Sequence, residues 1–225
     1  MDSLHASAHR STPAPSNAAC LLALAVASTV LAALVAGVLD GGAWVEFDHR
    51  VAIWFGHHAD TTLTDAMLLV THLNSTVAVG VYAALLGAFE AWRRHWRRVA
   101  LLVVCVGGGL ALNDFAKNVM QRARPVFDAP HLTLQTYSFP SGHAAGSTLL
   151  YGLLLVGWFT SMPRPWHRAA GTVAVIALVG LVALSRVYLG LHFVSDVLAG
   201  CAEGVAWLAL CLLAVNAWWP EQAAA

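Results

Sequence analysis

Charged residues are scarce in this sequence. Asp, Glu, Lys and Arg make up 11% of its 225 residues, whereas an ordinary soluble domain has about 25%. The 12 basic and 12 acidic residues cancel, so no basic excess points to a nucleic acid as a partner. Hydrophobic residues account for 59% of the chain and the mean hydropathy is +0.67, which argues against both a soluble enzyme and a disordered chain. The composition therefore predicts a protein that crosses a membrane several times.

Cysteine pairs with the spacing of a redox or zinc site are also lacking. The sequence has four cysteines, each inside an apolar run: Cys20, Cys105, Cys201 and Cys211. We interpret them as small apolar side chains without a chemical role.

Six stretches are apolar enough to cross a bilayer, whose core needs about 20 residues per helix. They lie near residues 18–39, 68–89, 99–121, 141–160, 169–188 and 192–218. The sequence therefore predicts an all-α fold, a bundle of six transmembrane helices. The first stretch is longer than the apolar core of a signal peptide, so we expect it to be a retained anchor.

The expected membrane domain covers residues 18–219. Residues 1–17 are rich in Ser, Ala, Pro and His, and we expect them to form a disordered cytoplasmic tail. Residues 220–225 are expected to form a second cytoplasmic tail.

Arginines in the short loops predict the orientation of the spans. Basic residues between spans two and three and between spans four and five mark the cytoplasmic side; they are Arg93, Arg94, Arg97, Arg98, Arg164 and Arg168. The acidic segment 40–65 then lies outside, where its aromatic residues can rest at the membrane interface.

Four cationic side chains do not follow this loop pattern, because they fall at the predicted outer ends of spans three and five. They are Lys117, Arg122, Arg124 and Arg186. Charges near membrane depth are costly and usually pair with a partner. The nearby carboxylates in the sequence, Asp114, Asp128 and Asp196, are too few to neutralise four cations and also orient a catalytic group. We therefore expect a bound anion.

The string Phe139-Pro140-Ser141-Gly142-His143 directly precedes the fourth span. Proline suits a helix start, serine can cap it, and glycine lets a ligand approach the backbone. The free N–H groups and the helix dipole would then favour an anion such as phosphate. Taken alone, the string fits an ordinary capped helix start equally well.

A third element begins with Ser185-Arg186 and continues with His192 and Asp196. The last two residues are four apart and share one helix face. The carboxylate can accept a proton from one imidazole nitrogen and leave the other as a nucleophile. An isolated pair of this kind also fits a hydrogen bond on a helix surface.

The predicted topology brings these elements to one membrane face. Spans three and five run outward and end at the cations, whereas spans four and six run inward and start at the histidines. Arginine binds phosphate oxygens through a bidentate fork, and lysine adds a point charge. The combination is typical of phosphoryl chemistry.

Taken together, the residues form a three-part pattern: Lys-x6-Arg-Pro from Lys117, Pro-Ser-Gly-His from Pro140, and Ser-Arg-x5-His-x3-Asp from Ser185. The pattern resembles the complete signature of the type 2 phosphatidic acid phosphatase superfamily in residue identity, order and spacing. The resemblance covers Lys117–Asp196 by motif, and most of the chain by its span pattern.

The resemblance implies catalytic roles for three residues. His192 would attack phosphorus and form a phosphohistidine, Asp196 would orient it, and His143 would protonate the leaving oxygen and later activate water. It also implies a phosphate-binding set: Lys117, Arg124, Ser141, Gly142 and Arg186. No metal and no cofactor are implied.

The implied activity is a metal-independent lipid phosphate phosphatase whose site faces the periplasm from a bacterial inner membrane. Its partners would be membrane lipids and a lipid phosphate substrate, with no prediction about oligomeric state. The candidate substrates are a polyprenyl diphosphate such as undecaprenyl diphosphate, phosphatidic acid and phosphatidylglycerol phosphate, and less favoured are lipid A phosphate or a sugar phosphate. Alternatives are a transporter or channel for phosphorylated solutes, a metal hydrolase and an inactive scaffold.

Glu203 is the remaining candidate. It lies about two helical turns beyond Asp196, near 10 Å deeper along the same span. A carboxylate within a membrane is a functional candidate by default, but we favour the interpretation of Glu203 as a protonated or hydrogen-bonded packing residue.

Overall fold

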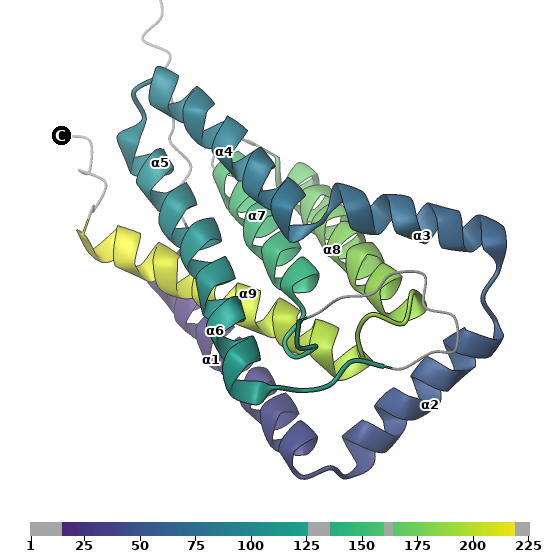
Figure 1. Cartoon of the computed structure of the whole chain (residues 1–225). Helices are drawn as coiled ribbons and strands as arrows, with labels where there is room; N and C mark the ends of the chain where they lie inside the picture. The colour runs from purple at the N-terminus through teal and green to yellow at the C-terminus, as the bar shows by residue number, and fades with distance from the viewer. Residues whose placement is uncertain (1–14, 126–135, 160–163, 219–225) are drawn as a thin grey trace, which may run out of the picture.

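The computed structural model describes residues 15–125, 136–159 and 164–218, and the regular secondary structure of this part of the chain is all helical, as predicted (Figure 1). Its helices are α1 (Asn17–Leu39), α2 (Ala43–His57), α3 (Thr61–Leu73), α4 (Thr76–Trp92), α5 (Trp96–Leu102), the π-helical η1 (Val103–Gly107), α6 (Gly108–Met120), α7 (Gly142–Phe159), α8 (Pro165–Tyr188) and α9 (Val194–Trp218). Of the expected tails, residues 1–14 and 219–225 lie outside the described residues. Asn17 already belongs to α1, which Ser16 caps by accepting the Ala19 N–H.

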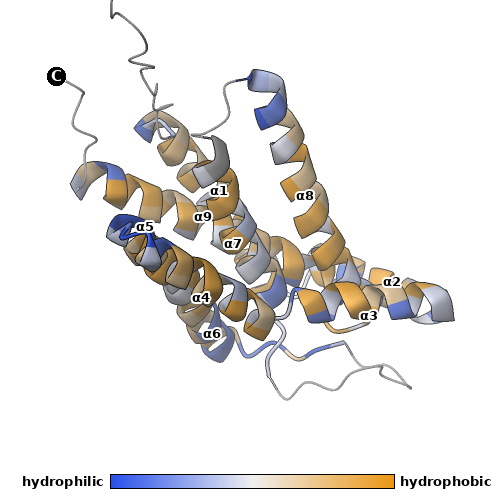
Figure 2. Ribbon diagram, turned by 90° about the horizontal axis from the view of Figure 1, so that it is seen from above, coloured by the Kyte–Doolittle hydropathy of each residue, from blue (hydrophilic) through white to orange (hydrophobic). Residues whose placement is uncertain are grey.

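Within the described residues, four helical segments are long and apolar enough to cross a membrane. They are α1, the continuous segment Trp96–Met120, α8 and α9. The pair α3 and α4 passes the same test together but is bent by 44°, which makes a fifth candidate, and α7 is a shorter apolar helix. In Figure 2, apolar residues run along most of the helices, and hydrophilic residues gather near helix ends such as the starts of α5 and α8. The protein is therefore an integral membrane protein.

The predicted span at 68–89 is not one straight helix. Asn74 ends α3, where its side-chain amide donates to the Val70 carbonyl at 2.9 Å. Ser75 then caps α4 by accepting the Ala78 N–H at 3.1 Å. Side chains that bond to nearby backbone groups compete with helix continuation and favour caps. Two polar residues thus break an otherwise apolar stretch.

Helix α2 was not predicted from the sequence; it lies within the predicted outer segment. Figure 1 shows α2 and α3 outside the bundle, beside the end at which α8 finishes and α9 starts. The Trp44, Phe47 and Trp54 rings on α2 are exposed, as expected for aromatic residues at a membrane interface.

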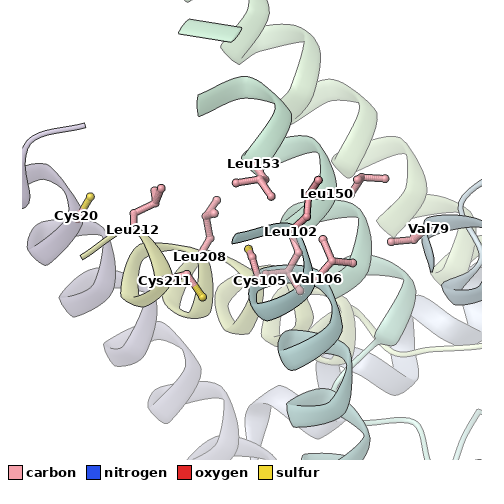
Figure 3. Packing of buried hydrophobic residues seen from close by; sticks show 11 residues of the cluster. Cys20, Val79, Leu102, Cys105, Val106, Leu150, Leu153, Leu208, Cys211 and Leu212 are labelled. Carbon is pink, nitrogen blue, oxygen red and sulfur yellow. The ribbon is translucent and has the colours of Figure 1, made fainter. Parts of the chain in front are cut away.

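One apolar cluster joins residues of α1, α4, α5, η1, α7 and α9. Val79, Cys105, Leu149 and Leu150 are almost fully buried there, and Figure 3 shows how their neighbours from η1, α7 and α9 meet. Cys20 and Cys211 belong to the same cluster, in agreement with their interpretation as apolar packing residues. Many other large apolar side chains, such as Leu85 and Ile176, face outward, where lipid would surround them.

The helices α7 and α9 lie very close to each other and run in the same direction. A Cβ atom at Gly200 would collide with the Ser141 carbonyl oxygen, and one at Gly204 would lie 2.8 Å from the Thr148 Cβ. Gly200 thus meets the start of α7, and Gly204, one turn further along α9, meets a residue further along α7. The two helices therefore run parallel and start side by side.

We predict that Gly200→Ala destabilises the protein by about 1–3 kcal/mol, the usual cost of overpacking, because the Ser141 backbone must move. The measurement is thermal unfolding in detergent. The matched control is Gly180→Ala on α8, where a Cβ meets open space; alanine there should be neutral or slightly stabilising. Equal melting temperatures for both variants would contradict the close approach of α9 to α7 at Gly200.

Candidate active site

The residues of all three sequence motifs meet at one end of the bundle. Lys117 lies in the last turn of α6, Arg124 follows that helix, and His143 stands in the first turn of α7. Arg186 lies in the last turn of α8, and His192 lies just before α9. Figure 1 shows the ends of these helices converging beside α2 and α3.

A tight turn between α8 and α9 brings His192 back over Arg186. The Arg186 carbonyl accepts hydrogen bonds from the backbone N–H groups of Leu191 at 3.0 Å and His192 at 3.2 Å. Gly190 adopts a left-handed conformation with φ of 67°, which a residue without a side chain adopts at little cost. The five residues between Arg186 and His192 in the sequence motif form this turn.

The start of α7 is joined to α9 through its backbone. The Ser141 N–H donates to the Asp196 carbonyl at 2.9 Å. The predicted capping by the serine side chain was wrong, because Ser141 Oγ has no hydrogen-bond partner among the described residues. The hydroxyl is buried and is left available to a ligand at the helix start.

His192 is held between a carboxylate and a guanidinium. Its Nε2 lies 3.2 Å from Arg124 Nη1, and its Nδ1 lies 3.4 Å from Asp196 Oδ2. The second contact is within ion-pair distance but lacks hydrogen-bond geometry. Because arginine can only donate, Nε2 must be an acceptor. The neutral imidazole therefore carries its proton on Nδ1, toward Asp196, and its lone pair on Nε2.

The environment of His192 favours this neutral form. The side chain is buried, and burial lowers the pKa of His192 well below its ordinary value. The positive charges of Arg186, Arg124 and Lys117 lower it further. A histidine that stays neutral among cations keeps the lone pair that a nucleophile needs.

The three cations around His192 are bound mostly by backbone carbonyl groups. Lys117 donates to the carbonyls of Tyr137 and Pro140, and Arg124 donates to those of Thr136 and Leu191. Arg186 donates to Thr71 Oγ1 at 2.5 Å. Within the described part of the chain, none of the three cations forms an ion pair with a carboxylate. Their charges remain available to an anion.

His143 completes the group. It is half-buried and lies close enough to Arg186, His192, Lys117 and Arg124 for their charges to act on it. Buried polar atoms without a partner are costly, and three of those found among the described residues belong to this site: Ser141 Oγ, Arg186 Nε and His192 Nδ1. A phosphate group could accept from the first two.

Arg122, the one of the four cations that the resemblance gave no role, is paired with two carboxylates. Its guanidinium pairs with Asp196 at 2.6 Å and with Asp48 of α2 at 2.9 Å. Asp48 was not among the candidate residues, because it lies 74 positions before Arg122. Its only sequence signal was a carboxylate in a segment rich in aromatic residues.

Glu203 also has a partner. Asn113 of α6 donates to Glu203 Oε2 at 2.6 Å, and both side chains are buried. Asn113 Oδ1 would lie 3.1 Å from a Cβ atom at Gly142. The pair therefore links α6 to α9 directly behind the start of α7.

Comparison with known proteins identifies the family of the chain. Residues 98–220 match the model of the PAP2 superfamily, the type 2 phosphatidic acid phosphatase superfamily whose signature the motifs resemble. The chain belongs to the PAP2 superfamily. A solved structure, described as the first transmembrane PAP2 type phosphatidylglycerolphosphate phosphatase from Bacillus subtilis, superposes with a TM-score of 0.76 at 26% identity, covering 88% of this chain and 98% of that one.

Two named phosphatases are similar in sequence. Phosphatidylglycerophosphatase B of Bacillus subtilis is 33% identical over 150 residues, which cover 64% of this chain and 70% of the relative. Decaprenylphosphoryl-5-phosphoribose phosphatase of Mycobacterium tuberculosis is 36% identical over 126 residues, or 54% and 63% of the two chains. The protein is thus a membrane phosphatase of a metal-independent superfamily.

The alternative in which His143, His192 and Asp196 bind a metal is not supported. No group of three His, Cys, Asp or Glu side chains suited to a metal ion occurs within residues 15–125, 136–159 and 164–218. In addition, Lys117, Arg124 and Arg186 would repel a cation at this position.

The lowered pKa of His192 predicts a pH-dependent stability. Below about pH 6.5, an exposed histidine in the unfolded chain takes up a proton that the folded protein excludes. The melting temperature should therefore fall as the pH drops below this value, at a cost of up to about 1.4 kcal/mol per pH unit. Thermal unfolding in detergent over this range measures the effect. His192→Asn should weaken the pH dependence, whereas His57→Asn, at an exposed position on α2, should preserve it; identical slopes would contradict the assignment.

Proposed function

We propose that this protein hydrolyses a phosphate ester of a membrane lipid through a phosphohistidine on His192. The observation that carries the proposal is the position of His192 Nε2. This atom faces Arg124 at 3.2 Å, beside two further cations without carboxylate partners in the described residues, at the ends of membrane helices. A lone pair that faces an anion-binding cluster is arranged for attack on phosphorus.

In the first step, His192 Nε2 attacks phosphorus, and the bond from phosphorus to the lipid oxygen breaks. His143 donates a proton to that oxygen, which leaves as the lipid alcohol, or as the lipid monophosphate when the substrate is a diphosphate. In the second step, His143 takes a proton from water, and the resulting hydroxide attacks the phosphohistidine. The P–N bond breaks, inorganic phosphate leaves, and His192 is regenerated.

The other residues of the signature would hold the phosphoryl group. Lys117, Arg124 and Arg186 neutralise its oxygens, and Ser141 Oγ and the Gly142 N–H donate at the start of α7. Phosphoryl transfer depends mainly on positioning and charge stabilisation. Asp196 would hold the Nδ1–H tautomer of His192 and stabilise the charge that develops on the ring.

The proposed substrates are lipids with an exposed phosphate. The two named relatives act on phosphatidylglycerophosphate and on a decaprenyl-linked phosphoribose, which share a phosphate ester on a lipid head group. We therefore propose a phosphomonoester or diphosphate of a glycerolipid or polyprenyl lipid, such as phosphatidylglycerol phosphate, phosphatidic acid or undecaprenyl diphosphate. The head group would reach the helix ends while the tail stays among the outward-facing apolar side chains.

The proposed topology has six spans. The bent pair of α3 and α4 would count as one span and α7 as another, since 18 residues of helix extend about 27 Å. The arginines of the α4–α5 and α7–α8 connections would lie in the cytoplasm. The site would then face the periplasm from a bacterial inner membrane.

The central prediction is release of inorganic phosphate by purified protein in detergent with excess chelator. The substrates to compare are a polyprenyl diphosphate, phosphatidic acid, phosphatidylglycerol phosphate and a water-soluble ester. We expect release from at least one lipid and a loss of about four orders of magnitude or more in kcat for His192→Ala, as when a catalytic nucleophile is removed. Undiminished activity of His192→Ala would disprove the mechanism. A loss of phosphate release on addition of chelator would instead support the alternative of a metal-dependent hydrolase.

The role of His143 predicts a different behaviour on an activated ester. The p-nitrophenolate anion leaves without protonation, so His143→Ala should still form the phosphohistidine from p-nitrophenyl phosphate but hydrolyse it slowly. We expect a burst of one p-nitrophenol per enzyme, followed by a slow steady state. Rapid-mixing absorbance measurements would detect it. A steady-state rate of hydrolysis as fast as that of the wild type would show that His143 does not activate water.

A further inference from the structure

Arg122 is only two residues from Arg124, but its surroundings are entirely different. Its Nη1 donates to Asp196 Oδ1 at 2.6 Å and to Ser195 Oγ at 2.7 Å, and its Nη2 donates to Asp48 Oδ2 at 2.9 Å. Two carboxylates therefore neutralise this guanidinium, whereas Arg124 is bound by carbonyl groups. Arg122 retains little charge for a substrate phosphate.

Asp48 anchors this arrangement from α2. This residue is 1% exposed. Its Oδ1 accepts the Ser195 backbone N–H at 3.0 Å, and its Oδ2 accepts both Arg122 and the Ser195 hydroxyl. A buried carboxylate needs a partner for its charge and for its lone pairs. Asp48 has both, and it ties α2 to the first turn of α9.

Asp196 is fixed at both of its carboxylate oxygens. Arg122 holds Oδ1, and the Phe193 backbone N–H donates to Oδ2 at 2.9 Å. This second oxygen is the one that lies 3.4 Å from His192 Nδ1. Rotation of the carboxylate away from His192 would therefore break a buried charge-assisted hydrogen bond.

The Phe193 ring packs against the Arg122 guanidinium. The guanidinium lies 4.4 Å from the ring centroid, a favourable cation–π distance. On α2, the His49 ring meets Phe193 edge-on at 5.1 Å. The planar fork of Arg122 is thus fixed by two carboxylates, a hydroxyl and an aromatic face, a geometry that lysine cannot reproduce.

We propose that Arg122 and Asp48 are positioning residues that hold Asp196, and through it His192, and that Arg122 does not bind the substrate phosphate. The proposal rests on the catalytic role of the His192–Asp196 pair given above. It assigns a function to α2, which would support the catalytic carboxylate from outside the helical bundle.

The test compares Arg122→Gln with Arg124→Gln in full-length protein in detergent. The activity probe is p-nitrophenyl phosphate, and the binding probe is inorganic orthovanadate, an anion of the same shape as phosphate. For Arg122→Gln we expect a kcat about 100-fold lower, the effect of misplacing a reacting group by about 1 Å, with KM and the vanadate Kd near wild type. For Arg124→Gln we expect the vanadate Kd to rise about tenfold or more, because a charge-assisted hydrogen bond to the anion is lost.

A double-mutant cycle tests the link to α2. Asp48→Asn should lower kcat without weakening vanadate binding, and adding Asp48→Asn to Arg122→Gln should cause little further loss, because both act through Asp196. The matched controls are Glu46→Gln and Arg50→Gln. These residues form an exposed ion pair on the same helix at 3.9 Å and should behave like the wild type.

Folding is checked by thermal unfolding and size-exclusion chromatography. If Arg122→Gln does not fold, Arg122→Lys, which keeps the charge but loses the fork, takes its place with the same expectation of lower kcat and unchanged vanadate Kd. A vanadate Kd that rises as in Arg124→Gln, or an unchanged kcat, would overturn the proposal. If p-nitrophenyl phosphate is hydrolysed but no lipid is, the proposed substrate fails while the comparison of variants still stands.

Discussion

The site depends on the close parallel contact between the first turns of α7 and α9. The Ser141 N–H binds the Asp196 carbonyl, and the absence of a side chain at Gly200 allows this approach. Two helices that start side by side place two positive dipole ends together, which is unfavourable unless negative charge lies there. Asp196 supplies one such charge in the first turn of α9, and a phosphate at the start of α7 would supply the other.

Burial gives the same groups their reactivity. Lys117, Arg124 and Arg186 lie at the end of an apolar bundle, where their charges are screened less than in water. Backbone carbonyls and Thr71 hold them in place before a substrate arrives, so little reorganisation is needed in the transition state. This fixed positive charge also lowers the pKa of His192 and favours its neutral form, which the proposed nucleophile requires. The features that favour the anion and those that activate the nucleophile therefore have one origin.

The sequence predicted those parts of the site that depend on short spacing and on the direction of consecutive helices. The turn between Arg186 and His192 and the i,i+4 relation to Asp196 are local, and the alternation of spans brings them to Lys117 and Arg124. The ion pair of Arg122 with Asp48 was missed because it joins segments 74 positions apart, and a single carboxylate carries no spacing signal. The break at Asn74 was missed because hydropathy averages over two polar residues among many apolar ones.

The different partners of Arg122 and Arg124 explain how one short segment can supply both structure and chemistry. A guanidinium between two carboxylates, such as Arg122, has its charge neutralised by fixed groups and contributes rigidity. A guanidinium bound by carbonyl oxygens, such as Arg124, keeps a net positive charge while its position is equally restricted. In a phosphatase that requires no metal ion, such cations must provide the charge that Mg²⁺ provides in other phosphoryl-transfer enzymes. In the proposed mechanism, the pairing of Asp196 with Arg122 leaves the charge of Arg124 to the phosphate.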